Sequence, residues 1–220
     1  MAAVAVLLVA ALLAAAPGPA RAQERPRLKA PSAILVEPAT GDIVLAKRAD
    51  DRRAIASTTK LMTALVTLER ASLDDVMTAV DYPAAAVESQ LGLRAGERLT
   101  VRDLLRGLLL ESANDAAATL AARVAGSRKA FVALMNRRAR ALRLRDTRFA
   151  NPIGLDQEGN FSSATDLVKL TLILRRFAFF RETVDQPRAT LRSGARVRTI
   201  ANRNTLVREV PEVSGVKTGR

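Results

Sequence analysis

The side chains of this sequence that could do chemistry together fall into three short groups, each of which holds a hydroxyl beside an amine or an amide. They are Ser57 with Lys60, Ser112 with Asn114, and Lys217 with Thr218 and Gly219. A serine hydroxyl is a poor nucleophile until a base takes its proton. A lysine can be that base if burial and nearby positive charge lower its pKa.

The spacing of Ser57 and Lys60 supports this chemistry. Residues three apart on a helix lie on one face, within reach of each other. The helix start adds N–H groups and a positive potential near the Ser57 oxygen. A lone Ser-x-x-Lys match is also typical of a serine that caps a helix, so by itself the spacing indicates little.

The other two groups also have a simpler interpretation. Ser112 and Asn114 are residue types favoured at helix starts, and Lys217-Thr218-Gly219 fits the end of a strand followed by a turn. In a catalytic site, the same Lys and Thr side chains could hold a carboxylate. The glycine would let a substrate backbone approach closely.

The composition excludes several other mechanisms. The 220 residues include no His and no Cys, which rules out a Ser-His-Asp triad, a cysteine nucleophile and a zinc site of the usual kind. The net charge of +13 suits a phosphate polymer, an anionic membrane surface or an anionic cell-wall polymer. Six Phe, one Tyr and no Trp offer few stacking platforms for single strands, so nucleic acid is the least favoured partner.

The N-terminus is typical of a secretory signal peptide. An apolar run covers residues 4–16, which is shorter than the roughly 20 residues that span a bilayer. Ala20 and Ala22 supply the small residues of a cleavage site. We therefore predict a signal peptide over residues 1–22 and a polar lead-in over 23–31; a buried N-terminal helix is the alternative. The mature chain is expected outside the cytoplasm, in the periplasm or cell-wall space, without a membrane span.

The remaining residues, 32–220, predict one α+β domain. Short strands are expected at 33–37 and 43–47 around a turn, and again within 189–200 and at 213–218. Helices are expected at 57–70, 114–124, 127–144 and 165–177. One more helix is expected to begin at the capping pair Thr100 and Asp103. We expect an antiparallel sheet built from the N- and C-terminal strands and packed against the helices. The arginines of the 127–144 helix favour a solvated face over a polymer-binding groove.

In this order, the three groups match the Ser-x-x-Lys, Ser-x-Asn and Lys-Thr-Gly signature of penicillin-binding proteins and class A β-lactamases. The sequence resembles the low-molecular-mass penicillin-binding proteins that act as serine-type D-alanyl-D-alanine carboxypeptidases. The likeness covers residues 32–220. Besides the three groups and their neighbours it includes the segments 33–36, 151–156, 162–167, 202–204 and 213–216.

The resemblance implies catalytic roles. Ser57 would attack the carbonyl of a terminal D-Ala-D-Ala bond and form an acyl-enzyme, after Lys60 accepts its proton. Ser112, with Lys217, would pass a proton to the leaving D-alanine amine. Water would then hydrolyse the acyl-enzyme, and β-lactams would trap Ser57. No metal and no cofactor is implied.

The resemblance also implies binding roles. Asn114 would hold Lys60 and the substrate amide, while Lys217, Thr218 and Gly219 would bind the substrate around its terminal carboxylate. The backbone N–H groups of Ser57 and Arg220 would form the oxyanion hole. The implied partners are a peptidoglycan stem peptide that ends in D-Ala-D-Ala, β-lactams as inhibitors, and anionic cell-wall polymers.

Three departures from the family pattern stand out. Ala113 occupies the middle of the Ser-x-Asn group, where Gly is common in the carboxypeptidases and Asp in class A β-lactamases. Arg220 stands where an aromatic residue or His is frequent. The family fold continues past Lys-Thr-Gly, so we expect its C-terminal strands and helix to be missing here.

Two alternatives remain open. A β-lactamase of the same fold needs a placed carboxylate for deacylation, for which Asp156 and Glu158 are the candidates. A catalytically idle protein could instead use the basic surface to hold an anionic wall polymer.

Overall fold

The computed structural model describes residues 27–219. The chain divides into the units Met1–Ala30 and Pro31–Arg220, and every helix and strand in the described residues belongs to the second unit. The predicted signal peptide and residues 23–26 lie outside the described residues. Within residues 27–219, no helix combines the length and the apolar character that crossing a bilayer requires.

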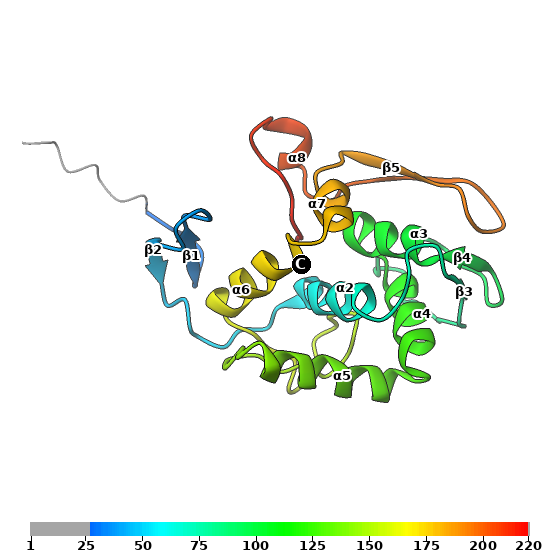
Figure 1. Ribbon diagram of the computed structural model, residues 1–220, viewed down its shortest axis with the longest axis horizontal. Coiled ribbons are helices and arrows are strands. Elements are labelled where there is room, and N and C mark those ends of the chain that lie inside the picture. Colours follow the sequence, from blue (N-terminus) through cyan, green and yellow to red (C-terminus); the bar gives the residue numbers. More distant parts are fainter. Residues whose placement is uncertain (1–26, 220) are drawn as a thin grey trace, which may run out of the picture. The chain divides into compact units, whose positions relative to one another are not determined.

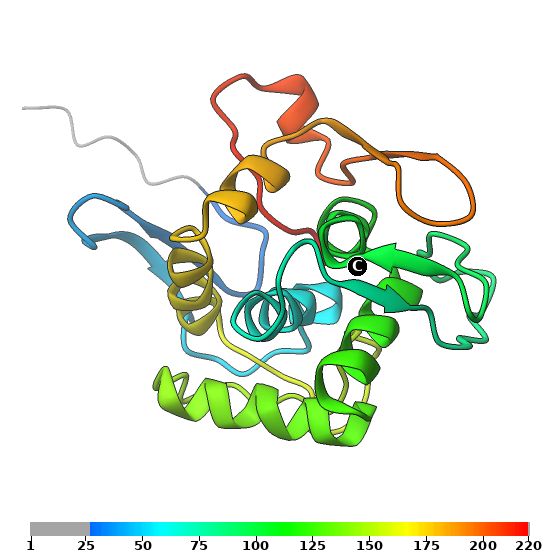
Figure 2. The ribbon, with the colours of Figure 1, turned by 45° about the vertical axis from the view of Figure 1, so that its right-hand side comes forward.

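Helix α2 (Lys60–Leu68) lies at the centre of the second unit (Figure 2). Its residues 60–67 are all buried. It packs against α4 (Asn114–Ala125), α5 (Arg128–Ala141), α6 (Ala164–Leu174) and the π-helical turn η2 (Gly107–Glu111). A helix with neighbours on all sides has no need of a polar face, which explains why its sequence is apolar almost throughout.

The leucine-rich stretch forms the second part of the core. It begins with α3 (Val101–Arg106), whose N-cap Thr100 accepts a hydrogen bond from Asp103 N at 3.3 Å, as the capping pair predicts. The helix then widens into the π-helical turn η2, whose leucines are buried. This turn ends at Ser112, which has a left-handed conformation with φ of 63°. This change of helix type directs the chain from the core toward α4.

Serine caps start two of the other helices. Ser127 accepts from Ala130 N at 3.1 Å before α5, and Ser163 accepts from Asp166 N at 3.2 Å before α6. The short helices α7 (Ala178–Val184) and α8 (Leu206–Glu209) carry no such cap and were not expected from the sequence.

The strands of the described residues form three separate two-stranded antiparallel sheets (Figure 1). The pairs are β1 (Ala33–Val36) with β2 (Ile43–Lys47), β3 (Val76–Thr78) with β4 (Arg98–Thr100), and β5 (Arg188–Leu191) with β6 (Arg198–Ala201). The first and third hairpins confirm the sequence prediction. The second was missed because its strands are three residues long and far apart in the chain.

The α+β class is confirmed, with one correction to the strand pairing. The N-terminal and C-terminal hairpins do not join in a common sheet within residues 27–219. The expected strand at 213–218 is irregular chain, because a strand needs a ladder partner and no described segment pairs with it. A side chain holds it instead: Asn204 Nδ2 donates to Gly215 O at 2.8 Å.

Candidate active site

Ser57 lies on the 3-10 turn η1 (Ala56–Thr59), which leads directly into α2. The turn is tight, since Thr58 donates to Ile55 O through both its backbone N at 3.0 Å and its hydroxyl at 2.6 Å. The predicted helix start at Ser57 is therefore a 3-10 turn, with the α-helix beginning at Lys60. Lys60 Nζ lies 3.1 Å from Ser57 Oγ, so the two side chains meet as their spacing predicts.

The loop of residues 152–154 contacts both the start of α2 and the turn η1. Lys60 Nζ also donates to Ile153 O, and Thr63 Oγ1 donates to Pro152 O at 2.7 Å. Gly154 presses on η1 so closely that a Cβ there would lie 2.1 Å from Ala56 O, and its φ is +90°. Only glycine meets both conditions without strain. The resemblance included this loop, but no feature of the sequence indicated its contact with Lys60.

Lys60 is the chemically unusual residue of the site. Its side chain is fully buried, with 0% exposure. Burial, which disfavours the ammonium form, and the nearby Lys217 lower its pKa to about 7, although Glu88 opposes the shift. A lysine whose pKa is about 7 is partly uncharged at neutral pH, so it can accept a proton from the hydroxyl that it contacts.

Ser112 and Asn114 enter the site from the junction of η2 and α4. Ser112 is only 5% exposed, and within residues 27–219 its Oγ is one of two buried side-chain polar atoms without a hydrogen-bond partner; the other is Arg106 Nε. A buried hydroxyl without a partner needs an explanation, and a role in the reaction would provide one. Asn114 is the first residue of α4 and donates from Nδ2 to Glu88 Oε2 at 2.6 Å.

Lys217, Thr218 and Gly219 reach η1 from the C-terminal segment, which runs toward the start of α2 (Figures 1 and 2). A Cβ on Gly219 would lie 3.2 Å from Ile55 O, so this backbone is in contact with the turn that carries Ser57. Lys217 Nζ donates to Thr218 O at 2.8 Å. Burial, together with Arg203, lowers the pKa of Lys217 to about 8. Arg220, the second predicted oxyanion residue, lies outside the described residues.

Arg203 contacts the end of η2. Its guanidinium donates to the carboxylate of Glu111 and, at 3.1 Å, to Glu111 O, while its backbone N donates to Leu110 O at 3.0 Å. The resemblance marked residues 202–204 without a role. The structure shows that Arg203 contacts the end of η2, just before Ser112, and that Asn204 contacts Gly215, just before Lys217.

Within residues 27–219, Glu88 is the carboxylate that bonds to Asn114 of the site, and no sequence prediction included it. Asp156 and Glu158, the earlier candidates, are exposed and make no hydrogen bond or ion pair to Ser57 or Lys60 within the described part of the chain. Glu88 lies in an irregular stretch without periodicity, so no sequence signal marked it. No group of three or more acidic side chains in residues 27–219 could hold a metal ion.

The comparison with known proteins agrees with this geometry. Residues 19–220 match the family described as D-alanyl-D-alanine carboxypeptidase. The carboxypeptidase DacF of Bacillus subtilis is 35% identical over 87% of this chain and 51% of its own length. The D-alanyl-D-alanine carboxypeptidase of Streptomyces sp. strain K15 is 34% identical over 99% of this chain and 82% of its own. The chain thus spans about half of DacF and most of the Streptomyces protein.

Solved structures show the same fold. The Streptomyces K15 DD-transpeptidase superimposes with a TM-score of 0.82 at 34% identity, over 89% of this chain and 82% of that one. Penicillin-binding protein 6B of Escherichia coli gives a TM-score of 0.81 at 35% identity, over 90% of this chain and 65% of that one. On the family match, the relatives and the fold, the chain belongs to the D-alanyl-D-alanine carboxypeptidase family of low-molecular-mass penicillin-binding proteins.

Proposed function

We propose that the protein is a serine-type D-Ala-D-Ala carboxypeptidase that removes the terminal D-alanine from peptidoglycan stem peptides. The observation that carries the proposal is the buried Lys60 amine, whose pKa is lowered to about 7 and which lies 3.1 Å from Ser57 Oγ. A structural lysine gains nothing from such a position, because burying an amine without a carboxylate costs free energy.

The first half of the reaction forms an acyl-enzyme. Lys60 accepts the Ser57 proton as Oγ bonds to the carbonyl carbon of the penultimate D-alanine. The C–N bond to the terminal D-alanine then breaks. Ser112, whose buried Oγ is not engaged by any other described group, and Lys217 pass the proton that Lys60 took up on to the leaving amine nitrogen, so that Lys60 is again a free amine. Each bond that breaks is thereby matched by a proton or electron pair transferred within the site.

The second half releases the peptide. Water adds its hydroxyl to the acyl carbon, the Ser57 ester bond breaks, and the water proton returns through Lys60 to Ser57 Oγ.

The remaining site residues bind the substrate and the transition state. Lys217, Thr218 and Gly219 hold the substrate around its terminal carboxylate, and Asn114 holds its amide. The backbone N–H groups of Ser57 and Arg220 stabilise the oxyanion, a type of contact whose loss costs about 3–4 kcal/mol of transition-state stabilisation.

Acylation by a β-lactam tests this mechanism. The strained lactam amide is attacked in the same way, but its leaving nitrogen stays attached, so the protein should gain the mass of the intact drug. We expect this adduct on the wild type and none on Ser57→Ala, measured by mass spectrometry. D-Ala release from a peptide ending in D-Ala-D-Ala is the companion assay. A folded wild type with no adduct would overturn the proposal, and rapid release of hydrolysed drug would instead indicate a β-lactamase.

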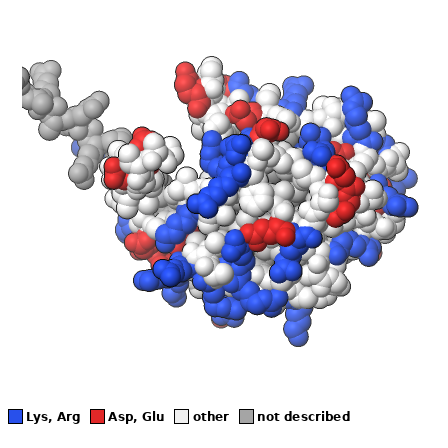
Figure 3. Space-filling view, viewed as in Figure 1, with Lys and Arg blue, Asp and Glu red and all other residues white. Residues whose placement is uncertain are grey.

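We also propose that the protein works outside the cytoplasm, where its substrate is cross-linked into the wall. The apolar leader at residues 4–16 supports export. Lys and Arg side chains gather on the face shown in Figure 3. Helix α5 also carries exposed arginines, among them Arg137 and Arg140. Such a surface suits work beside an anionic wall polymer. Salt-dependent retention on isolated cell walls, weakened by Arg137→Gln with Arg140→Gln, is the expected result.

A further inference from the structure

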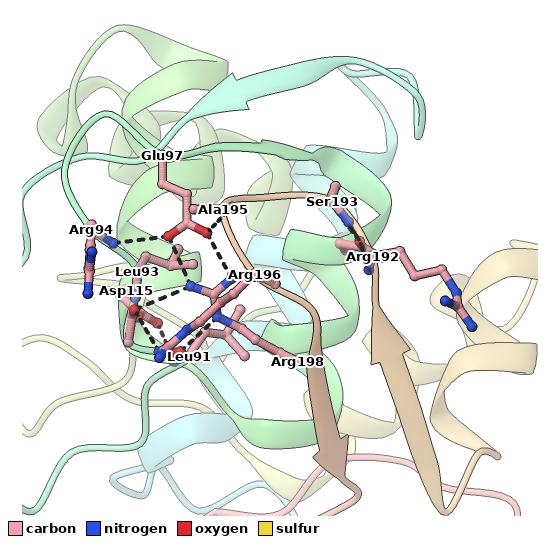
Figure 4. Close-up of polar contacts among 12 residues, drawn as sticks. Leu91, Leu93, Arg94, Glu97, Asp115, Arg192, Ser193, Ala195, Arg196 and Arg198 are labelled. Carbon is pink, nitrogen blue, oxygen red and sulfur yellow. Dashed lines mark hydrogen bonds and ion pairs between the residues drawn. The ribbon is translucent and has the colours of Figure 1, made fainter.

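The segment between β3 and β4 carries Glu88 to the start of α4 and is clamped there. Asn114 N donates to Ser89 O at 2.8 Å. The buried carboxylate of Asp115 accepts from Leu91 N and Leu93 N, both at 3.0 Å, and Figure 4 shows Asp115 beside these two residues. The position of Glu88 relative to Asn114 is therefore set by backbone contacts on its C-terminal side.

The Glu88 carboxylate is fully engaged. Oε2 accepts from Asn114 Nδ2 at 2.6 Å and from the Tyr82 hydroxyl, while Oε1 accepts from Ala85 N at 3.1 Å. Burial opposes ionisation of Glu88, but the hydrogen bonds from Tyr82, Asn114 and Ala85 and the charge of Lys60 outweigh it and lower its pKa. Burial and the bond to Glu88 conversely raise the pKa of Tyr82. Glu88 is thus an anion and Tyr82 a donor at neutral pH.

This arrangement fixes which end of the Asn114 amide faces the reaction. A carboxylate can only accept hydrogen bonds, so Asn114 must turn its NH₂ group toward Glu88. The amide oxygen then points away from Glu88 and is left for a donor elsewhere, namely the Lys60 amine or the N–H of a bound peptide. An unrestrained asparagine could present either end.

We propose that Glu88 is a positioning residue of the reaction, which fixes the side-chain amide of Asn114 and places one negative charge near the Lys60 amine. The inference rests on the proposed function and adds a residue to it. Because an opposite charge favours the protonated amine, Glu88 sets how much of Lys60 is free to accept the Ser57 proton at a given pH.

The titratable groups that face this cluster come from several elements of the described chain. They are Lys60 on α2, Lys217 and Arg203 from the C-terminal segments, Tyr82 and Glu88 from the segment before β4, and Asp115 on α4. In that set Glu88 is the anion that raises the pKa of Lys60, against burial and Lys217, which lower it.

Two variants separate the charge of Glu88 from its reach. Glu88→Gln removes the charge at constant size, and Glu88→Asp keeps the charge on a shorter side chain. The readout is the rate of Ser57 acylation by a fluorescent penicillin as a function of pH. With Glu88→Gln, the pKa of Lys60 falls, so the acid limb of the profile should move to lower pH. The plateau should fall about tenfold, the effect of losing one charge-assisted hydrogen bond.

Glu88→Asp should leave the acid limb in place and lower the plateau, because the shorter carboxylate no longer reaches Asn114. Asp81→Asn is the matched control, since it removes an equal charge from an exposed position of the same segment, and it should change neither quantity. Thermal melts establish that each variant is folded; should Glu88→Gln not fold, the Glu88→Asp profile decides.

The outcomes are distinguishable. A lower plateau with an unmoved acid limb in Glu88→Gln would reduce Glu88 to a structural role and overturn the inference. An unchanged plateau in Glu88→Asp would overturn it as well. If the wild type itself is not acylated at Ser57, the proposed function fails before Glu88 is tested.

Discussion

Glu97 and Arg198 are buried as an ion pair, whereas Lys60 is buried with another positive side chain, Lys217, near it. In the first region, drawn in Figure 4, the Glu97 carboxylate accepts from Arg198 Nη1 at 2.8 Å and Nη2 at 2.9 Å, and from Ala195 N at 2.8 Å. In the second, Lys60 Nζ contacts only the neutral oxygens of Ser57 and Ile153 among the hydrogen bonds of the described residues. Both regions remove a charged group from water, which costs free energy.

The two regions offset this cost differently. For Glu97, burial raises the pKa, but the bonds from Arg198, Ala195 and Arg94 outweigh it and bring the pKa to about 2. Its charge therefore persists and fastens the segment before β4 to the β5–β6 hairpin. For Lys60 no carboxylate makes such a bond, so the pKa falls to about 7 and the amine gives up its proton readily. A buried charge that is bonded to a group of opposite charge stabilises the fold, as at Glu97. A buried amine without such a partner gives up its proton and can act as a base, as at Lys60.

Replacement of Lys60 by methionine should separate the two regions most clearly. Lys60→Met fills the same space without an amine, so acylation of Ser57 should fall by about 10³-fold, the scale of a lost general base. The free energy of unfolding should stay the same or rise, because removal of a desolvated amine offsets its lost hydrogen bond to Ile153 O. Penicillin labelling and urea unfolding measure the two quantities.

The exposed Lys129 on α5 provides the control, since Lys129→Met should alter neither property. Acylation that survives in Lys60→Met would show that another group takes the Ser57 proton.

Glu97→Gln should have the opposite signature. It leaves the Arg198 guanidinium buried beside a neutral amide, and we expect a loss of about 3 kcal/mol in the free energy of unfolding. The pH dependence follows from the sign of the shift. The folded pKa of about 2 lies below the ordinary 4.5, so this stabilisation is present above pH 4.5 and is lost as the pH falls toward 2.

The control for Glu97 is Glu69, whose pair with Arg138 is more exposed, at 27% and 34% of their side chains. Glu69→Gln should cost less than about 1 kcal/mol. Equal losses in the two variants would remove the distinction between a buried and a surface pair.

The sequence predicted the parts of the site that depend on local spacing. Ser57 contacts Lys60 because the two are three residues apart on successive turns. Thr100 accepts a hydrogen bond from Asp103 N because of the same spacing. The hairpin within 189–200 followed from alternation around Ser193 and Gly194. Family resemblance added the loop that contains Ile153.

The parts that the sequence did not predict depend on contacts between distant residues. Glu97 and Arg198 are 101 residues apart, and nothing selects this pair among 22 acidic and 35 basic side chains. Glu88 reaches Asn114 only because the strand pair β3–β4 and the Asp115 clamp bring its segment there. The expected strand at 213–218 failed because strand formation requires a partner, which propensity alone does not supply.

Variants of Gly154 test whether contacts between uncharged groups hold Ser57 and Lys60 in position. Gly154→Ala puts a Cβ against Ala56 O in a backbone with φ of +90°, so we expect a loss of about 2 kcal/mol in stability and slower acylation, because η1 must move. Gly41→Ala is the matched control: its φ is +82°, but nothing lies within 4 Å of the added Cβ. It should cost only about 1 kcal/mol and leave acylation unchanged. A similar loss of acylation in both would refute the role of the Gly154 contact.

The smallest expected effect is a displacement of one limb of the pH profile. Acylation needs Lys60 without its proton and, for binding a carboxylate, Lys217 with one. The rate should therefore rise through a pKa of about 7 and fall through a pKa of about 8. Arg203 is one cause of the lowered Lys217 pKa. Arg203→Met should thus move the alkaline limb to higher pH and leave the acid limb in place, while Arg203→Lys, which keeps the charge, should move neither. If both limbs shift together in Arg203→Met, Lys60 and Lys217 titrate as one coupled pair. The contrast with the buried Glu97–Arg198 pair then belongs to both lysines and not to Lys60 alone.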